Sequence, residues 1–147
     1  MNKQQHCHAG SCDCGAVQIE YHCSQPLKEL SARACQCSFC VPQATSYLSE
    51  PDALLRVRIK DPRYLYAHCF GTRSADFMHC VICNALVFVK STIDDHDYGL
   101  VVASTLFEPP VAGEAVTVDY DTETLAQRLQ RRARHWIGTL EVVAGDS

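Results

Sequence analysis

Cysteine is the residue that most constrains what this chain can fold into, because ten cysteines occur in 147 residues. Seven of them fall into three short clusters: Cys12 and Cys14; Cys35, Cys37 and Cys40; Cys80 and Cys83. In a compartment that keeps thiols reduced, such spacings indicate metal or redox chemistry rather than a disulfide framework. The densest cluster packs three thiols into six residues, which is close enough for all three to bind one soft ion.

Composition narrows the class of protein. With 47% hydrophobic and 20% charged residues, the whole chain (1–147) is expected to form one globular domain with its own core. The first ten residues contain no apolar run, and no stretch approaches the length of a membrane span, so we expect a cytoplasmic protein without a membrane partner. The formal net charge is −4, and two zinc ions on seven thiolates would add 4 − 7 = −3. This acidity argues against nucleic-acid binding.

Most of the chain has the alternating pattern of half-buried strands. Val17, Ile19 and Tyr21 alternate with polar residues, and so do Leu55, Val57 and Ile59. Further strands are expected at about 46–49, 63–70, 85–93, 100–107 and 116–120. The strand around Leu55 carries Arg56, Arg58 and Lys60 on its other face, which we expect to be solvated rather than to bind a substrate anion.

One helix is predicted, at about 122–137. Its apolar positions recur at helical spacing, with Asp121 or Thr122 as N-cap and Gly138 as the stop: Leu125, Leu129, Ala133 and Trp136. The opposite face carries four arginines, Arg128, Arg131, Arg132 and Arg134. We expect this face to be solvated, the alternative being a docking patch for an acidic partner.

Turn residues surround two of the clusters. Gly10 and Gly15 bracket the first, where they permit positive φ or a close backbone approach, and Asn84 follows Cys83 at a position that often adopts positive φ. The acidic run from Asp94 to Asp97 lies between two predicted strands and is interpreted as a hairpin turn rather than a carboxylate metal site.

The ligand count favours one partition of the seven clustered thiols. Cys12, Cys14, Cys80 and Cys83 satisfy a closed tetrahedral structural zinc, which leaves Cys35, Cys37 and Cys40 to hold a second zinc with one open position, the arrangement of a catalytic zinc. Two alternatives stay open for the second site. Cys69 or a histidine could close it and make both ions structural, or the three thiols could form a metal-free redox site. His6 and His8 are interpreted as solvated histidines of a mobile terminus rather than ligands, and His79 as a neighbour of the CxxC pair. Cys69 is interpreted as a small buried hydrophobic residue rather than a ligand. The functions of Cys7, Cys23 and Cys69 stay unassigned.

These clusters lie in motifs that resemble the glutathione-dependent formaldehyde-activating family, also called the centromere protein V family. The resemblance covers about residues 8–107 and rests on three segments in register: HAGSCDCGAV at 8–17, CQCSFC at 35–40, and CVIC at 80–83 followed by an apolar strand. The helix after Asp121 adds nothing to it.

The resemblance implies a fold, two metal ions and an activity. The fold would be mainly β, with small coiled antiparallel sheets held by zinc (a β-tent) and, in this chain, one C-terminal helix. It implies a structural zinc on Cys12, Cys14, Cys80 and Cys83 and a catalytic zinc on Cys35, Cys37 and Cys40. The implied activity is that of a carbon-sulfur lyase, which adds glutathione or a similar small-molecule thiol to formaldehyde or a related aldehyde to give S-hydroxymethylglutathione or its analogue.

Three positions differ from the family pattern. Val41 stands where a basic residue commonly follows the third cysteine, His79 replaces an aromatic residue, and Asn84 replaces a glycine. Val41 bears on the substrate, because glutathione carries two carboxylates and a nearby cation would bind one. Replacement cations are available at Arg33, Arg56, Arg58 and Arg73. The alternative function is a non-catalytic, zinc-stabilised binding module in which both ions are structural.

Overall fold

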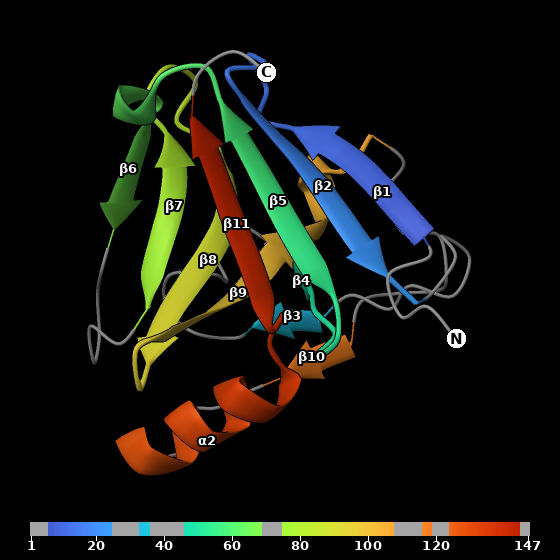
Figure 1. The fold of residues 1–147 in the computed structure, drawn as a ribbon, viewed down its shortest axis with the longest axis vertical. Helices are drawn as coiled ribbons and strands as arrows, with labels where there is room; N and C mark the ends of the chain where they lie inside the picture. Colours follow the sequence, from blue (N-terminus) through green and yellow to red (C-terminus); the bar gives the residue numbers. More distant parts are fainter. Residues whose placement is uncertain are drawn as a thin grey trace.

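The computed structural model describes residues 6–24, 33–35, 46–68, 75–107, 116–118 and 124–144. These residues form two β-sheets and one α-helix (Figure 1). The four-stranded sheet contains β1 (His6–Ser11), β2 (Val17–Cys23), β5 (Leu54–Ile59) and β11 (Thr139–Ala144), in that order. The seven-stranded sheet has the order β10 (Val116–Val118), β3 (Arg33–Cys35), β4 (Ser46–Leu48), β9 (His96–Val102), β8 (Leu86–Ile93), β7 (Asp76–Cys80) and β6 (Leu65–His68). Short 3₁₀ turns, η2 (Pro62–Tyr64) and η3 (Ala103–Thr105), precede β6 and follow β9.

The four-stranded sheet shows the alternation that its sequence predicts. Val17, Ile19 and Tyr21 of β2 and the facing Leu55 and Val57 of β5 are all 2% exposed or less. Their neighbours on the other face are polar and paired across the strands. Glu20 lies opposite Arg56, which in turn lies beside Glu141 of β11. One face of this sheet therefore builds the core, and the other carries a row of alternating charges.

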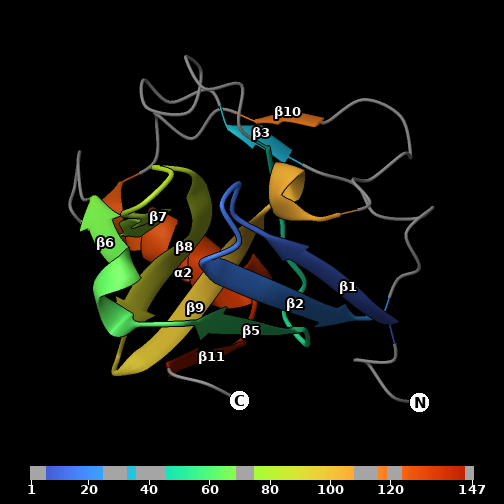
Figure 2. The ribbon, with the colours of Figure 1, turned by 90° about the horizontal axis from the view of Figure 1, so that it is seen from above.

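The seven-stranded sheet is apolar on both faces at its centre. Phe88 and Val101 belong to the core shared with the four-stranded sheet, whereas Val89 and Val102 belong to a second cluster on the other side. Figure 2 shows the sheet bending from β6 to β3 and β10 while it faces β2 and β5. The second cluster includes Trp136, which directly follows α2 (Leu125–His135).

The fold class predicted from the sequence is confirmed, since the described residues are mainly β with one α-helix near the C-terminus. Two pairings differ from an all-antiparallel arrangement, because β11 runs parallel to β5 and β10 runs parallel to β3. The strand β11 was not predicted. Its sequence TLEVVA alternates only weakly, and its last three residues are exposed.

Two predicted turns are confirmed in detail. Ile93 pairs with His96 across a two-residue loop in which Asp94 and Asp95 both have positive φ, 51° and 65°. This is the geometry of the hairpin turn that follows the right-handed twist of its strands. Asp94 and Asp95 therefore form the turn, and His96 and Asp97 begin β9. Asn84 also has positive φ, 61°, as its place after the CxxC motif predicts.

The helix begins later than predicted. Thr124 is the N-cap, not Asp121 or Thr122, because it forms a capping box in which its hydroxyl accepts from the Gln127 N–H at 3.1 Å and the Gln127 side chain accepts from the Thr124 N–H at 2.9 Å. Both orphan donors at the first turn are thereby satisfied. The helix ends at His135, with Trp136 as C-cap, before Gly138.

The predicted faces of this helix are wrong at two positions. Leu125 is 48% exposed, whereas Arg132 of the arginine-rich face is only 7% exposed. The Arg132 guanidinium lies 5.0 Å from the Trp136 ring centroid and donates to Ser91 Oγ at 3.2 Å. Stacking on an indole ring and a hydroxyl acceptor offset the loss of water around this cation.

The length and composition of α2 bear on whether it could cross a membrane. Within the described ranges, α2 falls short of the length and apolarity that a membrane-spanning helix needs.

The two glycines that bracket the first cysteine pair act differently. A Cβ on Gly10 would lie 2.2 Å from the Thr105 carbonyl oxygen, because β1 forms a bridge with Leu106 at this point. The close approach is thus to backbone rather than to a metal. Gly15 has φ of 82° and open space around its Cα.

We predict that Gly10→Ala lowers the free energy of unfolding by about 2 kcal/mol or more, as overpacking against backbone does. Gly15→Ala is the matched variant and should cost about 1 kcal/mol, through φ alone. Urea denaturation of both zinc-loaded variants measures the difference. Equal stability of Gly10→Ala and the wild-type protein would contradict the close contact with η3.

Candidate metal centre

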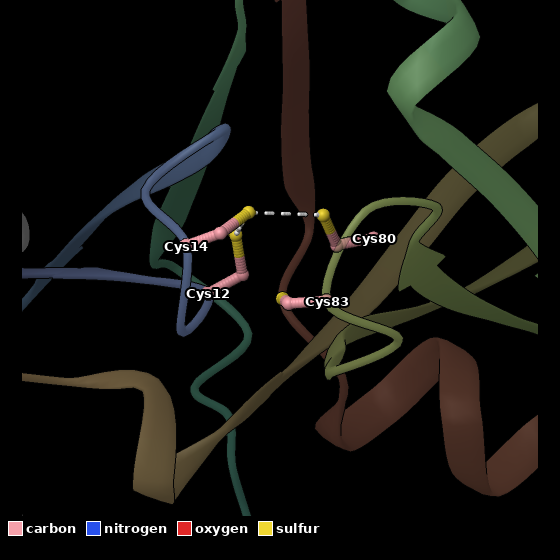
Figure 3. A group of neighbouring side chains, drawn as sticks. All are labelled: Cys12, Cys14, Cys80 and Cys83. Atoms are coloured by element: carbon pink, nitrogen blue, oxygen red, sulfur yellow. Dashed lines mark hydrogen bonds between the residues drawn. The ribbon is translucent and has the colours of Figure 1, made fainter.

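Four of the clustered cysteines lie in two hairpin loops, one from each sheet. Cys12 and Cys14 lie in the loop between β1 and β2, and Cys80 and Cys83 lie at the end of β7 and in the loop that leads to β8. The two loops face each other at the same end of the molecule (Figures 1 and 3). Segments more than 60 residues apart in the chain therefore bring their sulfur atoms together.

The first loop is a tight turn built around Cys12. The Cys12 N–H donates to the Val17 carbonyl at 2.9 Å, and the Gly15 N–H donates to the Cys12 carbonyl at 3.2 Å. The Val17 N–H donates to Cys12 Sγ at 3.3 Å, which stabilises negative charge on that sulfur. Positive φ at Gly15 lets the chain reverse within these few residues.

The second loop has the form of a zinc knuckle. The Cys80 N–H donates to the Ala85 carbonyl at 2.9 Å, and the Asn84 N–H donates back to the Cys80 carbonyl at 2.8 Å. The Val81 N–H donates to the Tyr64 carbonyl at 2.7 Å, which ties the loop to the end of η2. The Tyr66 hydroxyl also donates to Asn84 Oδ1, which holds the positive-φ residue of the loop in place.

The sulfur positions fit a tetrahedral metal ion. Cys14 Sγ lies 3.6 Å from Cys12 Sγ and 3.6 Å from Cys80 Sγ, and all four sulfurs lie within 4.8 Å of one another (Figure 3). Four thiolates around Zn²⁺ with bonds of about 2.3 Å place their sulfurs about 3.8 Å apart. Cys12 and Cys80 are buried, Cys83 is half-buried and Cys14 is exposed. The four residues could hold one metal ion, as the ligand count predicts.

The electrostatics of the cluster favour one thiolate in particular. Burial raises the pKa of Cys83, but hydrogen bonds from the Ala85 and Cys14 backbone and from the Cys80 and Cys12 thiols outweigh it, so its pKa is lowered from 9.0 to about 7. Burial raises the pKa of Cys80 to about 12, against the opposing backbone hydrogen bonds from Cys83 and Ile82. Of these two thiols, Cys83 therefore has the lowered pKa and Cys80 the raised one.

The structure describes only some of the remaining cysteines. Cys37, Cys40 and Cys69 lie outside the described residues, and for Cys35 the structure gives the backbone, at the end of β3. The second zinc site therefore stays a prediction, as do its alternatives. Cys23 is 1% exposed in the core, and Cys7 is exposed on β1, with its Sγ 3.8 Å from His22 Nε2.

The histidines near the clusters do not join the four sulfurs. His79 precedes Cys80, but its ring stacks on Tyr66, with centroids 5.0 Å apart, and its Nδ1 lies 3.0 Å from the Phe77 carbonyl oxygen. His6 and His8 were predicted to lie in a mobile terminus; instead both belong to β1, where His8 pairs with Tyr21.

Comparisons with known proteins give one informative result. The fold resembles the crystal structure of a Rhodobacter sphaeroides protein solved as a structural-genomics target, with a TM-score of 0.56 and 28% sequence identity. The match covers 75% of this chain and 99% of that one, and the description of that protein states no activity. No family model matches the chain, and no curated protein matches it.

The lowered pKa of Cys83 predicts how zinc binding depends on pH. Because thiolates bind the metal, protons compete with it, and the affinity for Zn²⁺ falls as the pH falls. Below about pH 7 Cys83 is also protonated, so one further proton must be displaced and the fall becomes steeper. Competition with a zinc chelator from pH 6 to 8 measures this. An unchanged slope across pH 7 would contradict a thiol of the four-cysteine cluster with a pKa near 7.

Proposed function

We propose that this protein is a zinc-dependent carbon-sulfur lyase of the glutathione-dependent formaldehyde-activating type. The observation that carries the proposal is the meeting of Cys12, Cys14, Cys80 and Cys83, whose four sulfurs can satisfy one ion by themselves. That leaves Cys35, Cys37 and Cys40 free for a separate task. The agreement of this partition with the family's motif supports the assignment of the structural site to the first four and of the catalytic site to the other three.

The register of the seven-stranded sheet supports a second site near the first. Arg33 of β3 pairs with Tyr47 of β4, and Tyr47 pairs with Val102 of β9. The strand β3, which ends at Cys35, is separated from β9 by one strand, β4, so β3 and β9 lie two strand spacings or about 10 Å apart, and η3 directly follows β9. Leu106, which caps η3, forms a bridge with Gly10 of β1, so η3 connects the base of the first cysteine loop with the sheet that contains β3.

The proposed reaction adds a thiol to an aldehyde. A zinc ion held by three thiolates would lower the pKa of a substrate thiol in its open position. The substrate loses its S–H proton, its sulfur forms a bond to the aldehyde carbon, and the carbonyl oxygen takes up a proton, so the product is a hydroxymethyl thioether. Cys35, Cys37 and Cys40 act as ligands in this proposal, and the nucleophile is the substrate's sulfur.

The substrate is a small thiol whose identity the described arginines do not fix as glutathione. Arg56 donates to Glu141 Oε2 at 2.9 Å and to Glu20 Oε1 at 3.3 Å, and Arg58 lies 3.8 Å from the same Glu20 oxygen. Both side chains therefore have acidic partners on the outer face of the four-stranded sheet. Their ion pairs do not support a role in binding the carboxylates of glutathione.

Paired cysteine variants test whether one zinc site is structural and the other catalytic. Cys37→Ser should lose about one zinc per chain and reduce the rate of S-hydroxymethyl thioether formation by at least about 100-fold, while circular dichroism and thermal stability stay close to wild type. Cys80→Ser should lose the other zinc and unfold at much lower temperature, because its ion joins the two sheets. Cys7→Ser, at an exposed position on β1, is the control and should change neither property.

The measurements are zinc content by mass spectrometry and product formation followed by NMR with ¹³C-formaldehyde and a thiol. Zinc bound by Cys37→Ser in full wild-type amount would contradict the second site. Two zinc ions in the wild-type protein without any turnover of formaldehyde with thiols would instead favour the non-catalytic binding module.

A further inference from the structure

A pocket of about 180 Å³ lies beside the four-cysteine cluster, in a place that the proposed function does not use. Its walls come from three segments: the first cysteine loop, the start of β8, and η3 with the end of β9. The residues that line it are Ser11, Cys12, Asp13, Ala85, Leu86, Val102, Ser104 and Thr105. Cys12 belongs to both the pocket wall and the metal cluster, so the loop that would bind the structural ion also shapes the pocket.

The polar side chains of this pocket present hydrogen-bond acceptors. Ser11 Oγ donates its proton to the Cys12 carbonyl at 2.8 Å, and Thr105 Oγ1 donates its proton to the Val102 carbonyl at 2.6 Å. A hydroxyl has one proton to donate and two lone pairs that accept, so a ligand that contacts these two oxygens must itself donate. Asp13, as an ionised carboxylate, only accepts.

One charged side chain, an acidic one, is found among the described residues that line the pocket. Asp13 is exposed at its rim, and a zinc ion on four thiolates beside Cys12 would carry 2 − 4 = −2. The side chains that line the pocket in the described part of the chain include no arginine, lysine or histidine. Leu86, Val102 and Ala85 add apolar surface for a short carbon chain.

We propose that this pocket binds the primary ammonium group of the substrate thiol, so that the preferred substrate is an aminothiol rather than a thiol that carries only carboxylates. An ammonium group offers three donors and a positive charge, which match the acceptors of Ser11 and Thr105 and the carboxylate of Asp13. The identification of the bound molecule as a thiol rests on the proposed function, in which a zinc-binding segment begins at Cys35 at the end of β3, two strands from β9 and the η3 turn that follows it. The preference for an ammonium group rests on the pocket alone.

Binding can be measured without the thiol group. Ethanolamine and 3-hydroxypropionate are small hydroxyl compounds that differ in ammonium against carboxylate, and both lack the sulfur that would bind zinc directly. Titration of the ¹⁵N-labelled, zinc-loaded protein should shift the amide signals of Asp13, Ser104 and Thr105 with ethanolamine, with a dissociation constant at least about fivefold lower than that for 3-hydroxypropionate.

Two variants test whether Asp13 causes the preference for ethanolamine over 3-hydroxypropionate. Asp13→Asn keeps the shape of the side chain and should reduce the preference for ethanolamine to less than about twofold, while Asp94→Asn removes the same charge from the distant β8–β9 turn and should leave it unchanged. Because Asp13 lies between two cysteines, zinc content and the absorption of the Co²⁺-substituted cluster must match wild type. Ser104→Leu, at an exposed position of η3, should weaken both ligands by filling the mouth of the pocket.

Turnover gives a separate readout. Cysteamine and formaldehyde also condense without an enzyme to a thiazolidine and water, so rates are taken above the enzyme-free blank. Above that blank, cysteamine should have a kcat/KM for formaldehyde addition at least about fivefold higher than 3-mercaptopropionate, and Asp13→Asn should remove the difference. Absence of shifts at the pocket with ethanolamine, or a tighter complex with 3-hydroxypropionate, overturns the ammonium pocket, even in an active enzyme. Selective ethanolamine binding without turnover of either thiol supports the pocket and counts against the proposed function instead.

Discussion

The structure depends on one constraint above the others, which is the meeting of four sulfurs from two hairpin loops. Closing the chain between Cys14 and Cys80, 66 residues apart, costs on the order of 4 kcal/mol of entropy. Binding of a structural zinc ion by four thiolates is worth on the order of 10 kcal/mol. The metal can therefore fix the ends of both sheets against each other, where the side chains alone leave Cys14 exposed and Cys83 half-buried.

The four cysteines lie at one end of the apolar core, which includes Cys12 and Cys80. Away from the cysteines, the facing sides of β2, β5, β8 and β9 form an apolar core, and the second face of β8 and β9 is covered by Trp136 at the end of the helix. At the cysteine end, backbone contacts and backbone conformation determine the structure. Gly10 admits η3 at van der Waals distance, Gly15 and Asn84 take positive φ, and backbone N–H groups donate toward sulfur. The acceptor-lined pocket arises in this region, because its walls are the same loops.

Much of this arrangement was predictable from the sequence, for specific reasons. The period-two alternation of apolar residues predicts β2 and β5. The ligand count predicts that Cys12 and Cys14 join Cys80 and Cys83, because tetrahedral zinc requires four ligands and the chain offers thiols in sets of two, three and two. The turns at Asp94 and Asn84 followed from residues that tolerate positive φ. In each case a short-range rule was sufficient.

What the sequence did not predict depends on contacts between distant segments. The edge strand β11 is stabilised by its parallel pairing with β5, and Arg132 is buried because Trp136 and Ser91 happen to surround it. The capping box at Thr124 was overlooked, although Gln127 three residues later was a usable signal. The pocket had no sequence signal, because Ser11, Asp13 and Thr105 come together only when the first cysteine loop contacts η3.

Anomalous diffraction from crystals of the wild-type protein, recorded at the zinc absorption edge, tests the central claim most directly. We expect one peak about 2.3 Å from each of Cys12, Cys14, Cys80 and Cys83 Sγ, and a second peak bound by Cys35, Cys37 and Cys40 whose fourth ligand is solvent or a substrate thiol. A fourth protein ligand at the second ion would contradict the catalytic assignment. Absence of any peak among the first four sulfurs would contradict the account as a whole.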